Sequence, residues 1–597
     1  MKTTYKEILE RNIRREHKYN LFQQGTRLNN KLKYRDDEAI VAGHFLSELK
    51  RKFTFGQQFT LEKGLKKFGD KGVKGTEKEI GQLHDRECFK PKRIDEMTHD
   101  QRRKAQVALA YLTEKKTGEV KGHVVYNCAP TRKYMEDVDT SSPTASLEGI
   151  LLTAMIDAHE NRDVMSSDIP NAFIQAPRTT ENGEEPVIMK IVGSLVGILV
   201  NMHPECYEEY VVYEKGKPVL YVEVLRALYG MLESALLWYN KFRKDLEAEG
   251  FEFNAYDPCV ANKTINRSQM TIRFHVDDLM SSHRDKSVND DFLRFLNKKY
   301  GKHVEVKATR GKRHDYLGMT FHFGNGRVEV DMVDYVQNML EEFPIKFANK
   351  RVPNPASPDM FDEGQGKYLD EEKRELFHRT TAKALFLCKR ARPDIQPIVS
   401  VLCTQVKKPA QRDFGKLVRM MKYLASTIDD TLRLSAANGL NKLEWYIDAS
   451  FAVHPDFKSH TGATMKFQGG LGSPIQISTK QKLNTDSSTT AELVAVHQGL
   501  PKVLWVPLFL EEQGYSVEEN TVFQDNQSAI LLEENGKKLS SKRTRHLNIR
   551  YFMVTDQVEK GHIIIKYCPT DDMIGDFMTK GLQGVKFAKF RKDIMGH

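Results

Sequence analysis

Apolar and polar residues alternate strictly along one short stretch of the chain, and this stretch ends in two adjacent carboxylates. The apolar positions share one parity and are Met270, Ile272, Phe274 and Val276. The polar positions of the other parity are Arg273, His275 and Asp277. The pattern predicts a half-buried strand with one polar, open face. A tight turn at its end would expose Asp277 and Asp278, which repel each other unless a cation lies between them. The Asp-Asp pair alone also suits an ordinary surface hairpin.

Helices and strands on either side complete a layer around this stretch. Apolar spacing predicts helices over residues 146–158 and 233–249, and a strand pair around residues 314–320. A strand over residues 164–168 stops at Ile169-Pro170, because proline lacks the N–H that a strand ladder needs. Asp168 therefore ends that strand. Together these elements predict an α+β layer, with Asp168 and Asp277 on the uncovered face of its sheet.

The region before this layer gives weaker signals. A helical stretch is predicted over residues 98–112, and residues 107–112 also pair with 120–126 in a predicted hairpin. On its second strand, Lys121 and His123 either contact a phosphate or are exposed hairpin residues. Residues 1–80 are polar and basic, and they suggest no chemistry.

The rest of the chain divides into a helical part and a final part that begins with strands. The whole chain has 597 residues, which is more than one hydrophobic core usually fills and favours roughly three or four domains. Helices are predicted over residues 335–342, 371–390, 395–405 and 414–427. A strand with alternating polarity begins near Leu443. The expected domains are a basic extension (1–80), an α+β domain (81–334), a helical domain (335–439) and a strand-containing domain (440–597).

Composition narrows the class of protein only modestly. The net charge of +10 suits a polyanionic partner, and basic residues cluster at Arg11–Lys18 and at Lys537–Arg545, although either cluster also suits a solvated face. No run of about twenty apolar residues occurs, so a membrane span is not expected. The N-terminus lacks an apolar signal region, so secretion is not expected. The seven cysteines form no Cys-x-x-Cys pair, which argues against a zinc or disulfide framework.

Two groups of carboxylates carry the candidate chemistry. Asp168, Asp277 and Asp278 converging on one cleft would be costly without divalent cations. With two Mg²⁺ ions, such a group becomes a site for in-line phosphoryl transfer. The second group lies in the last domain and comprises Asp448, Glu492, Asp525 and Asp576.

Each member of the second group has a structural alternative. Thr489-x-x-Glu492 is also a capping box, in which Glu492 would bond a backbone N–H. Asp525-Asn526 also suits a turn, and Asp571 and Asp572 look like ordinary acids at a helix start. Any one of these residues is more often structural than catalytic, whereas all four on one fold would indicate a site.

At these residues the sequence resembles the reverse transcriptase–RNase H region of the Pol polyprotein of copia-type LTR retrotransposons, from about Leu83 to Arg591. The landmarks of the first part are Ser167–Phe173, Ala227–Gly230, Tyr256–Cys259, His275–Asp278, Tyr316–Gly318 and Arg392–Ile395. Those of the second part are Asp448–Ser450, Ser487–Glu492, Asp525–Ala529, Arg543–His546 and Asp576–Lys580. The resemblance implies the downstream portion of a larger polyprotein, either a processed product or a genomic fragment.

The resemblance implies a right-hand polymerase with fingers and palm over 81–334 and a thumb or connection over 335–439. Asp168, Asp277 and Asp278 would be its metal-binding catalytic residues. Phe173 matches an aromatic steric gate beneath the sugar of the incoming nucleotide. The other implied substrate-binding residues are Lys121 at the triphosphate, Tyr229 and Gly230 in the nucleotide pocket, and Tyr316, Leu317 and Gly318 at the primer end.

For residues 440–597 the resemblance implies an RNase H-like domain. Asp448, Glu492, Asp525 and Asp576 would be both its metal ligands and its catalytic residues. Each active site would take two Mg²⁺ ions, with Mn²⁺ as an alternative. The implied partners are an RNA template, a DNA primer, an RNA–DNA hybrid and dNTPs, and no membrane. The chain would act as a homo-oligomer or with other polyprotein products, in a cytoplasmic retrotransposon particle or the nucleus.

Two other functions compete with a reverse transcriptase that also cleaves RNA. One is a decayed or domesticated element that only binds nucleic acid through basic surfaces. The other is a lone nuclease with an inert polymerase domain. The seven carboxylates favour the complete enzyme, because binding alone needs none of them.

Overall fold

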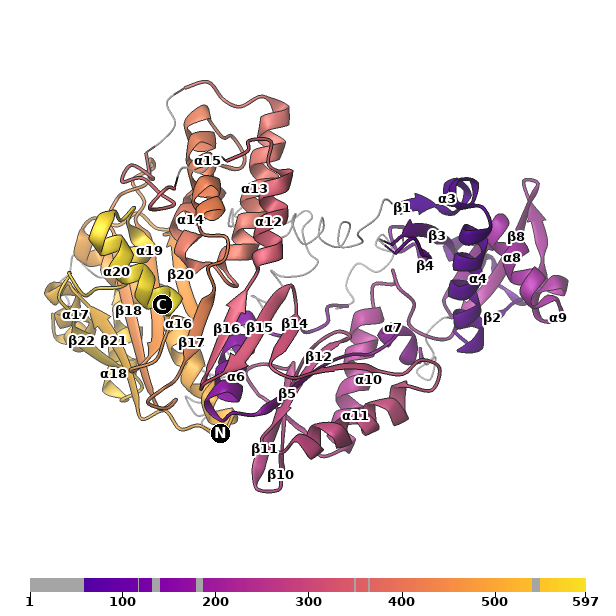
Figure 1. Cartoon of the computed structure of the whole chain (residues 1–597), viewed down its shortest axis with the longest axis horizontal. Helices are drawn as coiled ribbons and strands as arrows, with labels where there is room; N and C mark the ends of the chain where they lie inside the picture. Colours follow the sequence, from indigo (N-terminus) through magenta and orange to yellow (C-terminus); the bar gives the residue numbers. More distant parts are fainter. Residues whose placement is uncertain are drawn as a thin grey trace.

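The computed structural model describes residues 58–115, 117–130, 140–178, 186–347, 351–362, 366–539 and 548–597, and it describes no side chains over 537–539 and 548–552. Both predicted basic clusters and the landmark Arg543–His546 lie outside the described side chains. The molecule is elongated, with an N-terminal sheet at one end and the C-terminal domain at the other (Figure 1).

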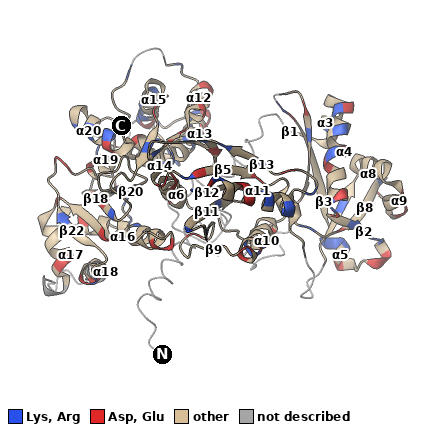
Figure 2. Cartoon of the chain, turned by 60° about the horizontal axis from the view of Figure 1, so that its bottom comes forward, with Lys and Arg blue, Asp and Glu red and all other residues tan. Residues whose placement is uncertain are grey.

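A seven-stranded sheet forms the end of the molecule that corresponds to the fingers. Its strand order is β1 (Gln58–Thr60), β3 (Gln106–Glu114), β6 (Ile188–Val192), β8 (Lys217–Val224) and β2 (Phe89–Pro91), with β4 (Val120–Tyr126) on β3 and β7 (Val212–Glu214) on β8. Its helices are α3 (Leu61–Phe68), α4 (Asp70–Asp85), α5 (His99–Lys104), α8 (Ser194–Met202) and α9 (Pro204–Tyr207). Basic and acidic residues are interspersed on α3, α4 and α5 (Figure 2).

The predicted hairpin over residues 107–112 and 120–126 is confirmed as β3 and β4. The predicted helix over residues 98–112 is wrong beyond Lys104. Thr98 caps α5 through a capping box with Gln101, and the following residues extend because β3 is paired with β1, β4 and β6. Strand pairing on both edges therefore overrides local helical spacing.

A six-stranded sheet corresponds to the palm and carries the first carboxylate group. Its strand order is β13 (Lys307–Arg310), β5 (Asp163–Asp168), β12 (Asp278–His283), β11 (Ser268–His275), β10 (Val260–Ile265) and β9 (Glu252–Phe253). Its helices are α6 (Leu147–His159), α7 (Ala172–Gln175), α10 (Ser234–Ala248) and α11 (Lys286–Tyr300). The predicted helices over 146–158 and 233–249 and the predicted strands of the hairpin are confirmed.

The prediction that β11 has one open face is wrong. Arg273 is fully buried, and its Nη1 donates to Asp157 Oδ2 of α6 over 2.7 Å. On the other face, Phe274 packs against Tyr239 and Phe242 of α10. A guanidinium can be buried here because a carboxylate neutralises it and accepts its hydrogen bond. Both faces of this strand are therefore covered along its middle, and only its two ends are partly exposed.

A smaller sheet and four helices follow, as expected of a thumb or connection. The strand order is β14 (Arg313–Tyr316), β15 (Met319–Gly324), β16 (Arg327–Asp331) and β17 (Leu432–Ser435). The helices α12 (Val333–Glu342), α13 (Glu371–Cys388), α14 (Gln396–Gln405) and α15 (Gln411–Ser426) confirm the four predicted ones. They stand above the sheet in Figure 1.

The C-terminal domain is built on a five-stranded mixed sheet. Its strand order is β20 (Ile475–Lys480), β19 (His460–Phe467), β18 (Lys442–Ser450), β21 (Glu519–Gln524) and β22 (Ile564–Tyr567). The first three strands are antiparallel, and the last two run parallel to β18. Its helices are α16 (Ser488–Glu512), α17 (Gln527–Leu539), α18 (Asn548–Glu559), α19 (Asp576–Thr579) and α20 (Gly584–Met595). This is the strand order that the sequence resemblance implies for residues 440–597, after the fingers, palm and thumb that it implies for the preceding residues.

Helix α16 joins the C-terminal domain to the palm. Trp505 Nε1 donates to Tyr256 O over 3.2 Å, and Phe509 O accepts from Asn254 Nδ2, also over 3.2 Å. Lys502 Nζ donates to Glu148 Oε1 over 2.5 Å, which ties the same helix to α6. One buried hydrophobic cluster consequently runs through the palm, the thumb and the C-terminal domain, whereas the fingers have a cluster of their own.

Two prolines interrupt the hydrogen bonding inside α16. Proline at position 507 lacks an N–H, which leaves the carbonyl of Val503 without its helical partner. Asn520 Nδ2 from β21 donates to that carbonyl over 3.0 Å. Of the helices within the described ranges, only α16 has the length and hydropathy of a membrane span, with 67% of its most apolar window buried. Its apolar surface is therefore explained by its place in the core.

We expect Trp505→Ala to uncouple the palm from the C-terminal domain, because it removes both a buried ring and a hydrogen bond to the palm. The loss in free energy of unfolding should be about 3–5 kcal/mol. Calorimetry should show one thermal transition in the parent chain and two in the variant. Val585→Ala, at a side chain that is 87% exposed, is the control and should not change the transition. A single, unshifted transition in Trp505→Ala would contradict the coupling.

Candidate active sites

The three carboxylates of the palm lie at one end of its central strands. In the antiparallel register of β5 and β12, Asp168 is directly opposite Asp278. The N–H of Ile169 donates to Asp277 O over 3.1 Å, so the chain after β5 stays beside the turn of the β11–β12 hairpin. Asp168 and Asp278 are exposed, and Asp277 is half-buried. The structure thus brings together residues that are far apart in the chain.

The turn that presents Asp277 has an unfavourable backbone conformation. His275 pairs with Asp278, so Val276 and Asp277 form a two-residue turn, and Val276 has a φ of 61°. A β-branched residue rarely adopts a positive φ, because its side chain crowds the backbone. Trp238 Nε1 of α10 donates to Val276 O over 2.6 Å. This bond fixes the carbonyl next to Asp277 from within the core.

The palm carboxylates repel one another. Burial, followed by the neighbouring charge of Asp168, raises the pKa of Asp277. The surrounding protein partly desolvates the carboxylate of Asp278. This desolvation, followed by the charges of Asp277 and Asp168, raises the pKa of Asp278 to about 6. In this part of the described structure, Asp168, Asp277 and Asp278 do not bring one carboxylate oxygen each to within 4.8 Å of the other two. A divalent cation would remove the repulsion and draw the carboxylates together.

Two aromatic side chains border these carboxylates. The rings of Phe173 and Tyr229 lie 4.8 Å apart between centroids, and the ring of His123 lies 6.1 Å from that of Tyr229. Burial, and then the charge of Asp277, raises the pKa of Tyr229. The two rings therefore form one side of the palm site, and His123 links them to β4 of the fingers.

Lys121 lies on the same strand as His123, and Gly230 directly follows Tyr229. Lys121 is exposed on β4 and has the same parity as His123, so both residues belong to the same face of the strand. Gly230 has a φ of 93°, and a Cβ atom there would approach Tyr126 O to 2.2 Å. Only glycine fits this contact, which holds the segment after Tyr229 against the end of β4.

Tyr316, Leu317 and Gly318 form the turn between β14 and β15 rather than part of the ring-lined site. Leu317 and Gly318 both have a positive φ, as a two-residue hairpin turn of type I′ requires. The side chain of Tyr316 is buried, and burial is the main cause of its strongly raised pKa. A Cβ atom on Gly318 would lie 3.6 Å from Phe386 of α13, so the turn adjoins the thumb.

The C-terminal domain brings three of its four predicted acids into one cluster. Carboxylate oxygens of Asp448, Glu492 and Asp525 all lie within 4.8 Å of one another. Asp448 lies near the end of β18, Glu492 in the first turns of α16, and Asp525 directly after β21. Since β18 and β21 are neighbouring parallel strands, their carboxyl ends meet at the same edge of the sheet.

The capping-box interpretation of Glu492 is wrong. The residue that caps α16 is Ser487, whose side chain accepts the N–H of Thr490 over 3.2 Å. Glu492 is instead 5% exposed, and its Oε2 has no hydrogen-bond partner. A capping role is thereby excluded, and the side chain is left facing Asp448 and Asp525.

Asp576 lies beside this cluster but is neutralised by lysines. Its Oδ1 accepts from Lys580 Nζ, and its Oδ2 accepts from Lys586 Nζ over 2.8 Å. Lys580 Nζ is also 3.7 Å from Asp448 Oδ2. Thr579 Oγ1 donates to the same oxygen of Asp448. Sequence reasoning assigned no role to Thr579 or Lys580, although the i, i+4 spacing of Asp576 and Lys580 is a signal for an ion pair.

The three clustered acids fit a divalent cation. Burial raises the pKa of Asp448 to about 6, even though Lys580 opposes the shift. Burial and the charges of Asp448 and Asp525 raise the pKa of Glu492 well above its usual value. Three oxygen donors with one unpartnered buried oxygen are the ligands that Mg²⁺ or Mn²⁺ takes.

Comparison with known proteins agrees with this architecture. Residues 207–355 match the family described as reverse transcriptase (RNA-dependent DNA polymerase). The chain is 24% identical over 486 residues to a retrovirus-related Pol polyprotein from transposon TNT 1-94 of Nicotiana tabacum, covering 80% of this chain and 34% of that protein. It is 25% identical over 473 residues to the Pol polyprotein from transposon RE2 of Arabidopsis thaliana, covering 79% and 30%. The transposon Ty1-ER2 Gag-Pol polyprotein of Saccharomyces cerevisiae is 22% identical over 377 residues, covering 60% and 21%.

Two solved structures are also similar. One is a foamy viral protease–reverse transcriptase in complex with double-stranded DNA, with a TM-score of 0.47 and 13% identity, covering 93% of this chain and 82% of that chain. The other is an RNase H1 isolated from compost, with a TM-score of 0.19 and 14% identity, covering 23% and 93%.

The matched segment is similar to reverse transcriptases, and the strand order of the C-terminal domain is the one that the sequence resemblance implies for an RNase H-like domain. The curated relatives are Pol polyproteins of plant and yeast transposons, and the similarity to them agrees with the copia-type resemblance of the sequence. The chain spans about a third of the length of these two plant Pol polyproteins.

Without divalent cations, the parent chain should lose stability relative to Asp448→Asn as the pH rises from about 4 to 6. The folded-state pKa of Asp448 is raised from 3.8 to about 6. Between these values the folded state holds the extra proton, so its stability is greatest at the acidic end of the window. Thermal midpoints in EDTA at several pH values measure the difference.

The residues Lys580, Asp576, Glu492 and Asp525 remain in both chains, so the difference reports the titration of Asp448 together with its effect on the pKa of Glu492. Asp315→Asn, at an exposed acid of β14, is the control and should follow the parent chain. A difference in thermal midpoint between the parent and Asp448→Asn that stays constant with pH would contradict the raised pKa of Asp448.

Proposed function

We propose that this chain is an RNA- and DNA-directed DNA polymerase whose C-terminal domain cleaves the RNA strand of an RNA–DNA hybrid. The observation that carries the proposal is the register of β5 and β12, which sets Asp168 opposite Asp278 with Asp277 in the adjoining turn. The cluster of Asp448, Glu492 and Asp525 supports the second activity. Its substrates would be a primed RNA or DNA template and dNTPs.

In the proposed polymerase reaction, the 3′-hydroxyl of the primer attacks the α-phosphate of a dNTP and pyrophosphate leaves. Asp168, Asp277 and Asp278 would hold two Mg²⁺ ions, with Mn²⁺ as an alternative. Bound cations lower the pKa of the attacking hydroxyl and neutralise the charge that develops on phosphorus. The half-buried Asp277 and the fixed Val276 carbonyl keep these ligands oriented between turnovers.

The rings beside the palm carboxylates would select the nucleotide. Phe173 would lie beneath the incoming sugar, where its ring excludes a 2′-hydroxyl. Tyr229 supports that ring from the side, and Gly230 keeps the backbone close enough to β4. Lys121 would contact the triphosphate from the same strand face as His123. The turn at Leu317 and Gly318, with the buried Tyr316 behind it, would support the primer end.

In the proposed nuclease reaction, a water molecule attacks a phosphodiester of the RNA strand and the 3′-oxygen leaves. Asp448, Glu492 and Asp525 would hold the cation that activates this water, and Asp576 would complete the set. The buried and unpartnered Glu492 Oε2 favours this role, since a cation would satisfy it. From the similarity to transposon Pol polyproteins, we also propose that the chain acts in a cytoplasmic retrotransposon particle with other products of its polyprotein.

Matched substitutions should separate the two activities. Asp277→Asn should lower primer extension on poly-rA/oligo-dT by about a thousandfold or more, because it removes a metal ligand. It should leave cleavage of the hybrid unchanged. Asp448→Asn should give the reverse result. Extension and RNA cleavage are followed on labelled substrates with Mg²⁺.

Each of the two competing functions, binding only and a lone nuclease, predicts its own outcome in this assay. If the parent chain retards hybrid in a gel but neither extends nor cleaves it, the binding-only alternative is right. If the parent chain cleaves the hybrid but extends no primer, the protein is a lone nuclease.

Phe173→Ala should admit ribonucleotides, because it removes the ring that excludes the 2′-hydroxyl. The ratio of kcat/KM for dNTP over rNTP should fall by about tenfold or more. Phe457→Ala removes an exposed ring in the C-terminal domain and should leave the ratio at the parent value. Unchanged selectivity in Phe173→Ala would remove the steric-gate assignment.

A further inference from the structure

A lysine ammonium lies between two carboxylates of the C-terminal site. Lys580 Nζ bonds Asp576 Oδ1 and is 3.7 Å from Asp448 Oδ2. Both carboxylates are almost completely buried, with exposed fractions of 1% and 2%. Lys580 therefore partly neutralises Asp448 and Asp576 together.

The backbone fixes this lysine where it can reach Asp448. Lys580 directly follows α19, and its N–H donates to Asp576 O over 3.0 Å. Helix α19 lies close to β19 at Gly462, which pairs with Asp448; a Cβ there would approach Thr579 Cγ2 to 2.5 Å. This close approach lets Thr579 and Lys580 contact Asp448 from one segment of chain.

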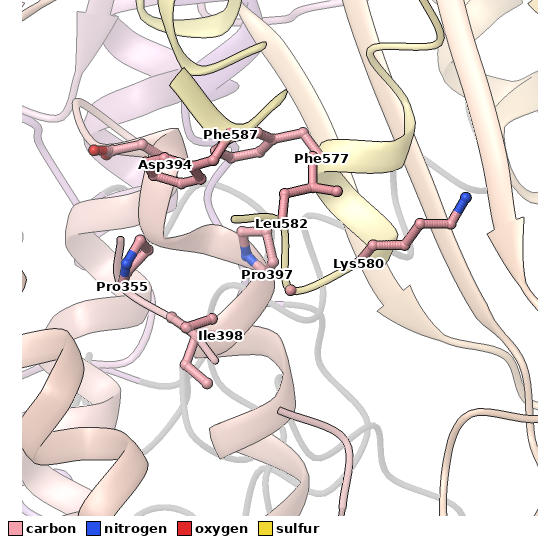
Figure 3. Close-up of a pocket in the computed structure, with 10 residues that line it drawn as sticks. Pro355, Asp394, Pro397, Ile398, Phe577, Lys580, Leu582 and Phe587 are labelled. Carbon is pink, nitrogen blue, oxygen red and sulfur yellow. The ribbon is translucent and has the colours of Figure 1, made fainter. Parts of the chain in front are cut away.

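The side chain of Lys580 is partly packed and partly exposed. The side chain lines a small hollow together with Pro397, Phe577 and Leu582, and its ammonium points away from these three residues (Figure 3). Two-fifths of the side chain is exposed. The ammonium can therefore move into solvent without repacking the core.

We propose that Lys580 is a tethered cation that occupies the place of a second divalent cation, between Asp448 and Asp576. The inference rests on the proposed nuclease function of this domain. The first divalent cation binds Asp448, Glu492 and Asp525, whose buried Glu492 Oε2 has no other partner. The second cation binds only by displacing the ammonium of Lys580, and this competition sets the cation concentration at which both places fill.

Binding of Mn²⁺ to full-length protein, followed by electron paramagnetic resonance, tests this displacement. Asp168→Asn and Asp277→Asn are included in every chain to remove binding at the palm. Lys580→Met should lower the second dissociation constant by about tenfold or more, the effect of one charge-assisted hydrogen bond. The signal of two spin-coupled Mn²⁺ ions should then appear at a correspondingly lower concentration.

Two further variants separate displacement from a general effect of charge. Lys586→Met removes the other lysine that pairs with Asp576. Lys586 has no described ion pair with Asp448, so this variant should keep the dissociation constant of the second Mn²⁺ near the parent value. Lys580→Arg keeps the positive charge and should also behave as the parent does. Circular dichroism confirms that each variant is folded.

The displacement is overturned if Lys580→Met leaves the second constant unchanged, or if Lys586→Met lowers it equally. In both cases the first Mn²⁺ still binds, so the proposed nuclease function survives. If no chain binds Mn²⁺ at this domain and the parent chain cleaves no hybrid, the proposed function fails together with the inference. Lys580→Gln repeats the test should Lys580→Met fail to fold.

Discussion

The structure depends on the burial of one long helix between two functional parts. Helix α16 begins at the acids of the C-terminal domain and ends against the palm, so its first turns carry Glu492 and its later turns carry Trp505 and Phe509. The hydrophobic effect favours this burial in proportion to the apolar area removed from water. Because one core includes the palm, thumb and C-terminal domain, the separation of the two carboxylate groups is fixed by packing rather than by a flexible linker.

The two groups of carboxylates use this frame differently. Those of the palm lie at strand ends that are open to solvent, and a strained turn held by Trp238 presents Asp277. Those of the C-terminal domain are mostly buried and are partly neutralised by lysines of the same domain. An open site of like charges suits a cation that arrives with a nucleotide, since Mg²⁺ keeps waters and phosphate oxygens as ligands. A buried site retains its own ligands and needs less from its substrate.

Much of this arrangement follows from the sequence. Alternation around Phe274, the proline after Asp168 and the periodicity of the thumb helices predict the elements correctly, because each is a local signal. Arg273 is the clearest failure. A charged residue on a strand suggests an exposed face, yet a distant acid, Asp157, makes its burial possible. Glu492 has a local alternative that only the position of Ser487 excludes, and the contact of Lys580 with Asp448 spans most of the C-terminal domain. These features depend on long-range contacts that a single sequence does not reveal.

The separate core of the fingers has a consequence for how such elements diversify. The fingers come from two segments of chain, β1 to β4 and β6 to β8, so an exchange that carries both also carries α6, β5 and α7 of the palm. The central helix of the C-terminal domain must in turn match the surface around Asn254 and Tyr256. A mosaic chain assembled by recombination should therefore fold best when its palm and C-terminal domain come from one lineage.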